Sequence, residues 1–432
     1  MDLVIYIAGA VVFFLLVMAS IALHEIGHLV PGKLFDVKTT QYFVGFGRTL
    51  WSRRRGETEY GIKLFPLGGY VRFVGMFPPA RSNPGKVRQY STGPFRALAD
   101  NARAAEWQDI RQEDDGRLFY QKKSWQKLII MAGGPTMNIL LAFVILLGVC
   151  ATYGVYRSQL VINRVQECIV ASTAPDQTCV GKPLTPAALS GIRKGDRIVA
   201  FNHQPVSDWD DVSTLIRANL DHPALLTVVR DGQQIDLTPV NTVITGVADR
   251  YDPSTRVAAG FFGVEPVVAR ERGGPVAVLG DMWEMTQQTA VALADFPVKV
   301  FYTAYNLITG KPRDIYGPMS IVGASRAAGE IASTNKIGAG DKIASLFTVL
   351  GSVNLFVALF NFVPLLPLDG GHIAGALYEA VKRALARLFR RPDPGHVDTA
   401  KMLPIAYVVG GIILISGVVL ILADIIDPIR LF

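Results

Sequence analysis

The sequence predicts a polytopic α-helical membrane protein with four transmembrane helices. Hydrophobic residues make up 50% of the 432-residue chain and charged residues only 18%, which is less charge than soluble proteins usually carry. Four long segments contain no charged residue: 3–23 with 21 residues, 128–156 with 29, 343–368 with 26 and 402–423 with 22. Because a helix needs about 20 apolar residues to cross a bilayer, each segment is long enough to span it.

Other features narrow the class of protein further. The three cysteines are too few for a disulfide scaffold or a four-cysteine zinc module. We attribute the net charge of +7 to membrane topology and anionic lipid, and expect no nucleic-acid partner. Four buried helices of a large soluble protein are the alternative, but such helices rarely run so long without a charge. The first segment lacks a preceding basic residue, so we interpret it as a retained span and not a signal peptide.

Loop charges predict how the four helices run through the membrane. Segment 31–127 carries 18 Lys or Arg against 9 Asp or Glu, and segment 370–401 carries 6 against 3. The long segment between them, 151–342, carries 18 against 19. Positively charged loops tend to stay in the cytoplasm. We therefore expect 31–127 and 370–401 to be cytoplasmic loops, and the middle segment and both termini to lie outside.

The first predicted helix, 1–30, ends in the motif His24-Glu25-Ile-Gly-His28. Side chains four residues apart share one face of a helix, so His24 and His28 can bind one metal ion. Glu25 lies beside them and can take a proton from a water that the metal activates. Ionisable side chains at the end of an apolar span are costly and usually functional. The alternative is an interfacial helix end whose charges simply meet water.

A hydrolytic zinc site needs three protein ligands, and we favour Asp369, at the end of the third predicted helix, 343–369, as the third. The first and third helices run in the same direction, with 21 and 26 uncharged residues before their polar ends. Both ends therefore reach a similar depth near the cytoplasmic face. His372 is a possible ligand but lies further out. Alternatively, Asp369 and the two glycines after it form an ordinary turn.

The second predicted helix, 128–156, carries Gly133, Gly134 and, about 15 Å along the helix, Asn138. Small residues let membrane helices approach closely, and packing alone explains the glycines as well as a function does. A buried amide needs a hydrogen-bond partner. The extended backbone of a substrate would provide one for Asn138 and for Asn361 in the third helix.

Three motifs together resemble those of the site-2 proteases, which are intramembrane zinc metalloproteases: the His24–His28 motif, Gly-Pro-x-x-Asn138, and Asn361-x-x-Pro364-x-x-Pro-x-Leu-Asp369-Gly. Gly45-Phe46-Gly47 and Pro66-Leu-Gly-Gly-Tyr70 resemble the bacterial branch that regulates sigma factors. The resemblance covers most of the chain. It implies one zinc ion (Zn²⁺) bound by His24, His28 and Asp369, Glu25 as general base, and substrate contacts from Asn138, Asn361, Pro364, Gly45, Phe46 and Gly47.

Residues 41–75 are too polar for a membrane-spanning helix, and strand-like stretches flank their glycine and arginine clusters, as in a hairpin. By resemblance to the family, this hairpin is re-entrant and dips toward the metal site. An exposed strand edge there can pair with an unwound substrate segment. The alternative is a soluble cytoplasmic hairpin. Residues 77–124 are rich in Pro, Arg and acidic residues, and we expect a cytoplasmic loop without chemistry of its own.

In the outside segment, residues 158–265 resemble one extracytoplasmic PDZ domain of α+β type, where bacterial relatives often carry two. The resemblance rests on Gly195-Asp196-Arg-Ile198, on an amphipathic stretch at 208–219 and on an Asp231-Gly232 hairpin turn. PDZ domains bind extended peptides at a sheet edge. Residues 276–325 predict an amphipathic helix on the outer membrane surface, followed by a linker.

The cysteines divide into two kinds. Cys168 and Cys179 lie in a polar stretch of the outside segment and can form a disulfide there; two free thiols are the alternative. Cys150 lies within the second predicted helix, where it serves as an apolar filler.

These observations predict an intramembrane zinc endopeptidase of the bacterial plasma membrane, with its site near the cytoplasmic face. It would cut a single-pass membrane protein, such as an anti-sigma factor, after another protease has removed most of the outside domain. The PDZ domain would act as a size filter or tail sensor. A metal-ion transporter would instead spread its ligands along a pathway and often show an internal repeat. An inactive scaffold built around the PDZ domain is disfavoured because the ligand set is complete.

Overall fold

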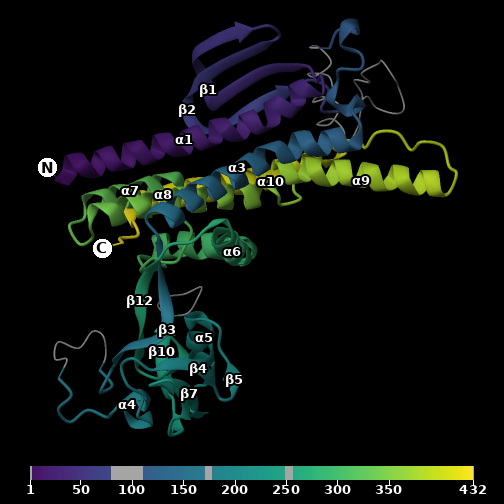
Figure 1. The fold of residues 1–432 in the computed structure, drawn as a ribbon. Coiled ribbons are helices and arrows are strands. Elements are labelled where there is room, and N and C mark those ends of the chain that lie inside the picture. The colour runs from purple at the N-terminus through teal and green to yellow at the C-terminus, as the bar shows by residue number, and fades with distance from the viewer. Residues whose placement is uncertain (1, 79–109, 171–177, 249–255, 432) are drawn as a thin grey trace. The chain divides into compact units, whose positions relative to one another are not determined.

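The structure is a computed structural model and describes residues 2–78, 110–170, 178–248 and 256–431 (Figure 1). Residues 79–109 of the predicted cytoplasmic loop lie outside this described part. The chain divides into two compact units. A helical unit comprises Met1–Val149, Gly274–Ile308 and Ile315–Phe432, and a sheet unit comprises Cys150–Gly273 and Thr309–Asp314.

The helical unit contains the long apolar helices. Its elements are α1 (Asp2–Leu34), β1 (Thr39–Arg55), β2 (Thr58–Phe73), α3 (Ser124–Thr152), α6 (Pro275–Thr309), α7 (Ile321–Ser333), α8 (Ala339–Asn361), α9 (Asp369–Leu388) and α10 (Leu403–Ile426). Short 3-10 turns lie at Gln112–Asp114, Phe119–Gln121 and Thr399–Met402. Within the described residues, four helices are long and apolar enough to cross a membrane, namely α1, α3, α8 and the segment Thr399–Ile426 that includes α10. The four predicted spans therefore correspond to four helices of the structure.

The third of these helices is shorter than the sequence suggests. The uncharged run predicts a helix over 343–369, whereas α8 ends at Asn361 and Asp369 begins a new helix, α9. Pro364 and Pro367 lack the N–H groups that a continuing helix would use. The chain turns tightly between the two helices. A Cβ atom at Gly370 would lie only 2.2 Å from the carbonyl oxygen of Val363, so only glycine fits here. An uncharged run cannot by itself distinguish an apolar turn from a helix.

Helix α9 also changes the description of segment 370–401. The sequence predicts a cytoplasmic loop there, yet α9 accounts for 20 residues from Asp369 to Leu388. The charges of this segment do not exclude a helix, since Lys, Arg, Leu and Ala all favour one. What the sequence identifies as a charged loop is largely an amphipathic helix.

Small residues bring α1 and α7 together. A Cβ atom at Gly9 would lie 2.5 Å from the Cβ of Ala332, and one at Gly329 would lie 2.8 Å from the carbonyl oxygen of Tyr6. Buried side chains of α1, α7 and α8 form a shared core, with Phe13, Val17, Ala328 and Leu350. Such close approach is what stabilises helix pairs in lipid, where the hydrophobic effect between helices is weak.

Strands β1 and β2 form a curled two-stranded sheet beside the C-terminal half of α1 (Figure 1). Val44 has both Gly69 and Ile62 as partners, so the first half of β1 lies between the two halves of β2. Residues 69–73 then form an edge of the sheet. The Tyr42 hydroxyl donates a hydrogen bond to the carbonyl oxygen of Ala22 at 2.9 Å, which fixes the sheet against α1.

A buried carboxylate fastens α9 to the start of α3. Glu379 is 2% exposed, and its oxygens lie 2.9 Å from Lys127 Nζ and 3.2 Å from Ser124 Oγ. The backbone N–H of Val397 also donates to it, at 3.1 Å. Burial alone would raise the pKa of Glu379, but hydrogen bonds from His396 and Lys127 outweigh burial and lower that pKa to about 2. The carboxylate is therefore charged and paired at neutral pH, as buried charges must be.

The sheet unit contains a mixed α and β fold with one main sheet. Its elements are β3 (Val155–Val165), α4 (Pro186–Ser190), β4 (Arg197–Phe201), β5 (Gln204–Pro205), α5 (Trp209–Ala218), β6 (Pro223–Ala224), β7 (Leu226–Arg230), β8 (Gln233–Asp236), β9 (Val240–Asn241), β10 (Val243–Ala248), β11 (Arg256–Phe261) and β12 (Val264–Glu271). The main sheet has the order β12-β3-β4-β7-β8, with β5 paired to β4. The predicted PDZ range, 158–265, falls within this unit, and the PDZ assignment stays a prediction.

Apolar side chains and capped helices hold the sheet unit together. Ile162, Ile198 and Val228 have no exposed surface and belong to its main core. Helix α5 begins at a side-chain cap, because the Asp208 carboxylate accepts a hydrogen bond from the N–H of Asp211 at 2.8 Å. The unit also has neighbouring ends, since Val155 at the start of β3 pairs with Glu271 at the end of β12.

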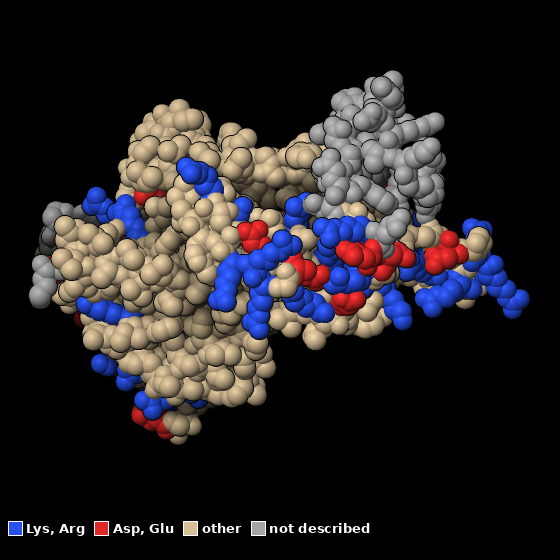
Figure 2. Space-filling view, turned by 90° about the horizontal axis from the view of Figure 1, so that it is seen from above, with Lys and Arg blue, Asp and Glu red and all other residues tan. Residues whose placement is uncertain are grey.

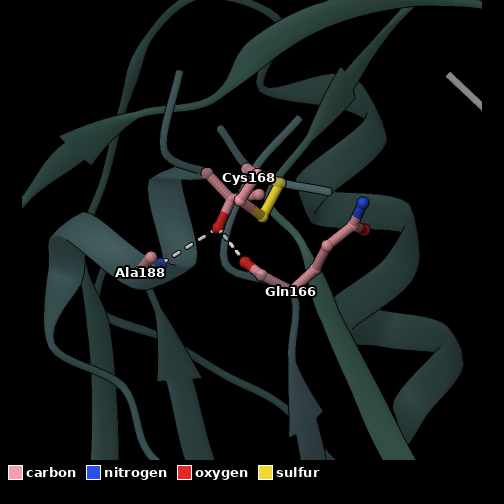
Figure 3. Close-up of a disulfide and its surroundings, with 5 residues drawn as sticks. Gln166, Cys168 and Ala188 are labelled. Atoms are coloured by element: carbon pink, nitrogen blue, oxygen red, sulfur yellow. Dashed lines mark hydrogen bonds between the residues drawn. A yellow bond between two sulfur atoms is a disulfide. The ribbon is translucent and has the colours of Figure 1, made fainter. Parts of the chain in front are cut away.

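Cys168 and Cys179 are joined by a disulfide in the structure (Figure 3). Cys168 is 1% exposed and lies beside the turn that begins α4. There the Thr185 hydroxyl donates to the carbonyl oxygen of Gln166 and accepts from the N–H of Ala188, the latter at 3.1 Å. The remaining cysteine, Cys150, is free and buried.

We expect protein isolated from membranes without reductant to contain the Cys168–Cys179 bond, because both cysteines lie in the predicted outside segment. Mass spectrometry after thiol blocking should detect one linked peptide pair. Buried Cys150 serves as an internal control for an unlinked thiol. Rapid labelling of both Cys168 and Cys179 in unreduced protein would contradict the prediction.

Candidate metal centre

The end of α1 brings two imidazoles together. His24 and His28 lie one turn apart, and their Nε2 atoms are 3.2 Å from each other. Both residues are buried, with 8% and 5% of their surface exposed. An uninterrupted helix supplies this spacing, because side chains at i and i+4 lie on the same face.

Asp369 reaches the same point from a distant part of the chain. Its Oδ2 atom lies 3.3 Å from His24 Nε2 and 3.2 Å from His28 Nε2. The turn after α8 and the start of α9 position this carboxylate. His372, the other candidate, is not part of the cluster of His24, His28 and Asp369 that the described residues form.

The cluster fits a small divalent metal ion. For zinc bonded at about 2.0–2.1 Å, neighbouring ligand atoms of a tetrahedron lie about 3.3 Å apart, and the three measured separations are 3.2, 3.2 and 3.3 Å. Two nitrogens and one carboxylate oxygen are the ligand types that zinc prefers at catalytic sites. Asp369 Oδ2 is buried and makes no hydrogen bond within the described part of the chain. A cation would satisfy this atom.

Helix α3 orients one of the imidazoles. His28 Nδ1 lies 2.8 Å from the carbonyl oxygen of Ile130. A carbonyl oxygen only accepts hydrogen bonds, so Nδ1 carries the proton and the lone pair of Nε2 faces the cluster. Such a contact to the outer nitrogen is common among metal-binding histidines and sets the ring orientation.

Two glycines of α3 allow this close approach. A Cβ atom at Gly133 would lie 2.0 Å from the carbonyl oxygen of Gly27 on α1, so the two helix backbones touch here. A Cβ atom at Gly134 would lie 2.2 Å from His28 Nε2 and 2.7 Å from His24 Nε2. Gly133 therefore serves packing, whereas Gly134 leaves the space in front of both ligand nitrogens open.

We expect Gly134→Ala to weaken metal binding at least about tenfold, because the added methyl group would displace the imidazoles of His24 and His28, the predicted ligands. Zinc content after dialysis against a graded series of chelator concentrations measures this effect. Gly148→Ala on the same helix is the matched control, since a Cβ atom there would meet nothing within 4 Å. Equal zinc retention by both variants would show that the space at Gly134 is unimportant.

Glu25 lies between the metal cluster and the sheet. It is 8% exposed, and a Cβ atom at Gly69 would lie 2.8 Å from its Cγ and 3.2 Å from its Oε1. Strand β2 thus passes over the Glu25 side chain at Gly69, which has no side chain that would block the approach. The contact places an edge of the β1–β2 sheet next to the carboxylate.

The three residues predicted from the second and third motifs lie in different surroundings. Asn138 is 2% exposed, and its Oδ1 has no hydrogen-bond partner within the described residues. It lies one turn after Gly134, on the face of α3 that meets the imidazoles. Asn361 ends α8 and is half-buried, while Pro364 is exposed in the turn that follows.

The segment Gly45-Phe46-Gly47 presents an aromatic ring on the sheet. Both glycines have positive φ angles, 93° and 86°, which residues with side chains rarely adopt. Phe46 is 46% exposed, and its ring stacks on that of Tyr70 with centroids 6.1 Å apart. Tyr70 belongs to the edge segment 69–73, so the two rings flank the same edge that approaches Glu25.

Several residues that support the site carry no signal in the sequence. Gly69 and the carbonyl of Ile130 act through the backbone, which no side-chain motif records. Glu379 and Lys127 are far apart in sequence, and each looks like a solvent-exposed charge of a predicted cytoplasmic segment.

Comparisons with known proteins agree with this arrangement. The sequence model of Peptidase family M50 matches residues 12–390. Zinc metalloprotease Rip1 of Mycobacterium tuberculosis (strain H37Rv) is 32% identical over 99% of both chains, and its counterpart in Mycolicibacterium smegmatis is 32% identical over 98% of both. Metalloprotease MmpA of Caulobacter vibrioides is 27% identical over 86% of both chains.

Proposed function

The chain belongs to peptidase family M50 and is a zinc metalloprotease of the membrane, and from this premise we propose that it cuts single-pass membrane proteins within or near their transmembrane segment. The site-2 proteases of this family act on membrane-protein substrates within the bilayer. The finer proposal is regulated intramembrane proteolysis of a substrate such as an anti-sigma factor, after a first cut outside. The observation that carries the proposed cleavage in the membrane is the cluster of three ligand residues, with Glu25 beside it, at the end of an apolar helix.

We assign the following roles. His24, His28 and Asp369 hold the zinc ion, supported by their mutual distances of 3.2–3.3 Å. When bound there, the ion would supply Lewis acidity toward the scissile carbonyl and lower the pKa of a water. Glu25 would act as the general base that accepts the proton of the attacking water and as the acid that passes it to the leaving nitrogen of the substrate. The buried position of Glu25 keeps bulk water from competing for the proton.

The edge segment 69–73 is proposed to hold the substrate as an added strand. Within the described residues this segment pairs with 39–44 on one side, and we propose that the substrate pairs along its other side. A transmembrane helix must unwind before hydrolysis, and a strand edge satisfies the backbone groups that unwinding releases. Gly69 brings this edge to Glu25. Asn138 of α3 would bind the substrate backbone through its Oδ1 atom, which has no hydrogen-bond partner among the described residues.

The site is proposed to lie near the cytoplasmic face of the bacterial plasma membrane. The support is the net positive charge of segments 31–127 and 370–401, which flank the metal-binding ends of α1 and α9. The sheet unit would then be outside, consistent with its disulfide. The hairpin of β1 and β2 would be re-entrant, and α6 would lie along the outer membrane surface.

Cleavage by purified protein tests the proposed function. A single-pass substrate truncated on its outside part should be cut, chelator should stop the cut, and restored zinc should recover it. Mass spectrometry of the products locates the bond. A cut only in a soluble region far from the transmembrane segment, or equal activity with chelator, would reject the proposal.

We further propose that the sheet unit restrains access and takes no part in catalysis, because every residue of the described metal cluster and Glu25 belong to the helical unit. Val155 and Glu271 are paired, so residues 156–270 can be replaced by a short glycine-serine linker. The shortened protein should still cut the truncated substrate and should also cut some full-length substrate. A shortened protein that folds and binds zinc yet cuts neither substrate would contradict this proposal.

A further inference from the structure

Helix α9 has an apolar face that the described residues leave exposed. Four side chains at helical spacing form it, with exposed fractions of 49% for Leu377, 56% for Val381, 48% for Leu385 and 74% for Leu388. On the opposite face, Ala376 and Glu379 are buried, with 5% and 2% exposed. The helix thus packs inward through one side and presents a continuous apolar stripe on the other. A stripe of this kind usually marks a contact surface.

Positive charge borders this stripe. Five Lys or Arg and no Asp or Glu occur between Ala380 and Pro392, namely Lys382, Arg383, Arg387, Arg390 and Arg391. Arg387, Arg390 and Arg391 are exposed. Figure 2 shows many Lys and Arg, with some Asp and Glu among them, toward the end of the helical unit at which α9 ends. An apolar stripe flanked by cations is the signature of a helix that lies in a membrane interface.

The position of α9 in the chain suits that role. Seven residues separate the end of α8 from the start of α9, so α9 begins at the membrane boundary of a candidate span. Among the described helices, α9 is not one of the four that are apolar enough to cross a membrane. Its inner side is fixed to α3 through Glu379 and Lys127, which leaves the outer side facing away from the protein core.

We propose that α9 lies in the headgroup region of an anionic lipid leaflet. Its apolar stripe faces the acyl chains, and Arg387, Arg390 and Arg391 bind lipid phosphates. Arginine pairs with phosphate through two parallel hydrogen bonds, and long cationic side chains keep their charge in the headgroup layer while their stems cover apolar surface. This surface is separate from the zinc chemistry, although α9 begins at Asp369.

The charge distribution favours lipid over a second copy of the chain. Arg383 is ion-paired with the buried Glu379, but pairing two α9 helices through their stripes would still bring together two sets of the other four cations, which is repulsive at short range. An anionic leaflet has the opposite charge and also accepts the stripe. Lipid therefore satisfies both the apolar and the cationic part of the surface.

A fluorophore on Ala384→Cys tests this proposal in the full-length protein. Ala384 is exposed between Val381 and Leu388. Cys150 is buried and the other two cysteines are bonded, so labelling is selective. In vesicles of phosphatidylcholine mixed with phosphatidylglycerol, a lipid carrying a nitroxide near its headgroup should quench the label. Replacing Arg387, Arg390 and Arg391 by Gln should reduce that quenching at least about twofold.

Two further variants complete the test. R193Q/K194Q/R197Q removes three exposed cations of the sheet unit and should leave quenching unchanged. V381E/L385E should reduce the quenching of the label. Zinc content and circular dichroism in detergent show whether this variant keeps its fold. The proposal is overturned by a label that lipid does not quench, by equal quenching in the two arginine-to-glutamine variants, or by cross-links between copies through position 384.

Discussion

Glu25→Gln is expected to keep its zinc and lose cleavage. Glutamine preserves the shape of the side chain beside Gly69 but cannot accept the proton of the attacking water. Loss of general-base catalysis typically costs about 10²–10⁴-fold in rate. Zinc content and proteolysis of the truncated membrane substrate should be measured on the same preparation, because only the combination separates a lost base from a lost metal.

A charge-matched control makes the Glu25 result specific. Glu113→Gln also removes one carboxylate, but at a side chain that is 71% exposed, and it should cleave at the wild-type rate. Normal turnover of the Glu25 variant would remove Glu25 from the catalytic assignment. Loss of zinc from that variant would instead indicate that Glu25 supports the ligands.

Asp369→Ala should lower zinc occupancy sharply, because two imidazoles alone leave the ion with too few protein ligands. The variant also leaves His24 and His28 without the carboxylate that lies 3.2–3.3 Å from both Nε2 atoms. Elemental analysis after gel filtration measures bound zinc per protein, and cleavage should fall with it.

His372→Ala is the matched control for the third ligand, since His372 lies on the same helix but outside the cluster of the described residues. We expect it to retain most of its zinc. If the His372 variant loses zinc and the Asp369 variant keeps it, the ligand assignment is reversed. Similar loss in both would indicate that α9 as a whole, and not one side chain, holds the ion.

The sequence by itself determined the features that depend on local spacing. Charge-free runs long enough to cross a bilayer predict four spans, and the described part of the chain contains four helices of the required length and apolarity. The i, i+4 spacing of His24 and His28 determines their common face, since it follows from helix geometry alone. The family likewise follows from short motifs, and the match over residues 12–390 bears it out.

The similar depth of two helix ends suggested Asp369 as the third ligand, but only the tertiary structure decided how distant segments make contact. The approach of Asp369 to His24 depends on a turn after Asn361, which an uncharged run cannot reveal. The roles of Gly134, Gly69 and the Ile130 carbonyl depend on helices and strands passing within contact distance. Glu379 and Lys127 become partners only when α9 packs on α3. Side-chain periodicity encodes one element at a time, whereas the site is assembled from backbone contacts between elements, and these leave no periodic signal in the sequence.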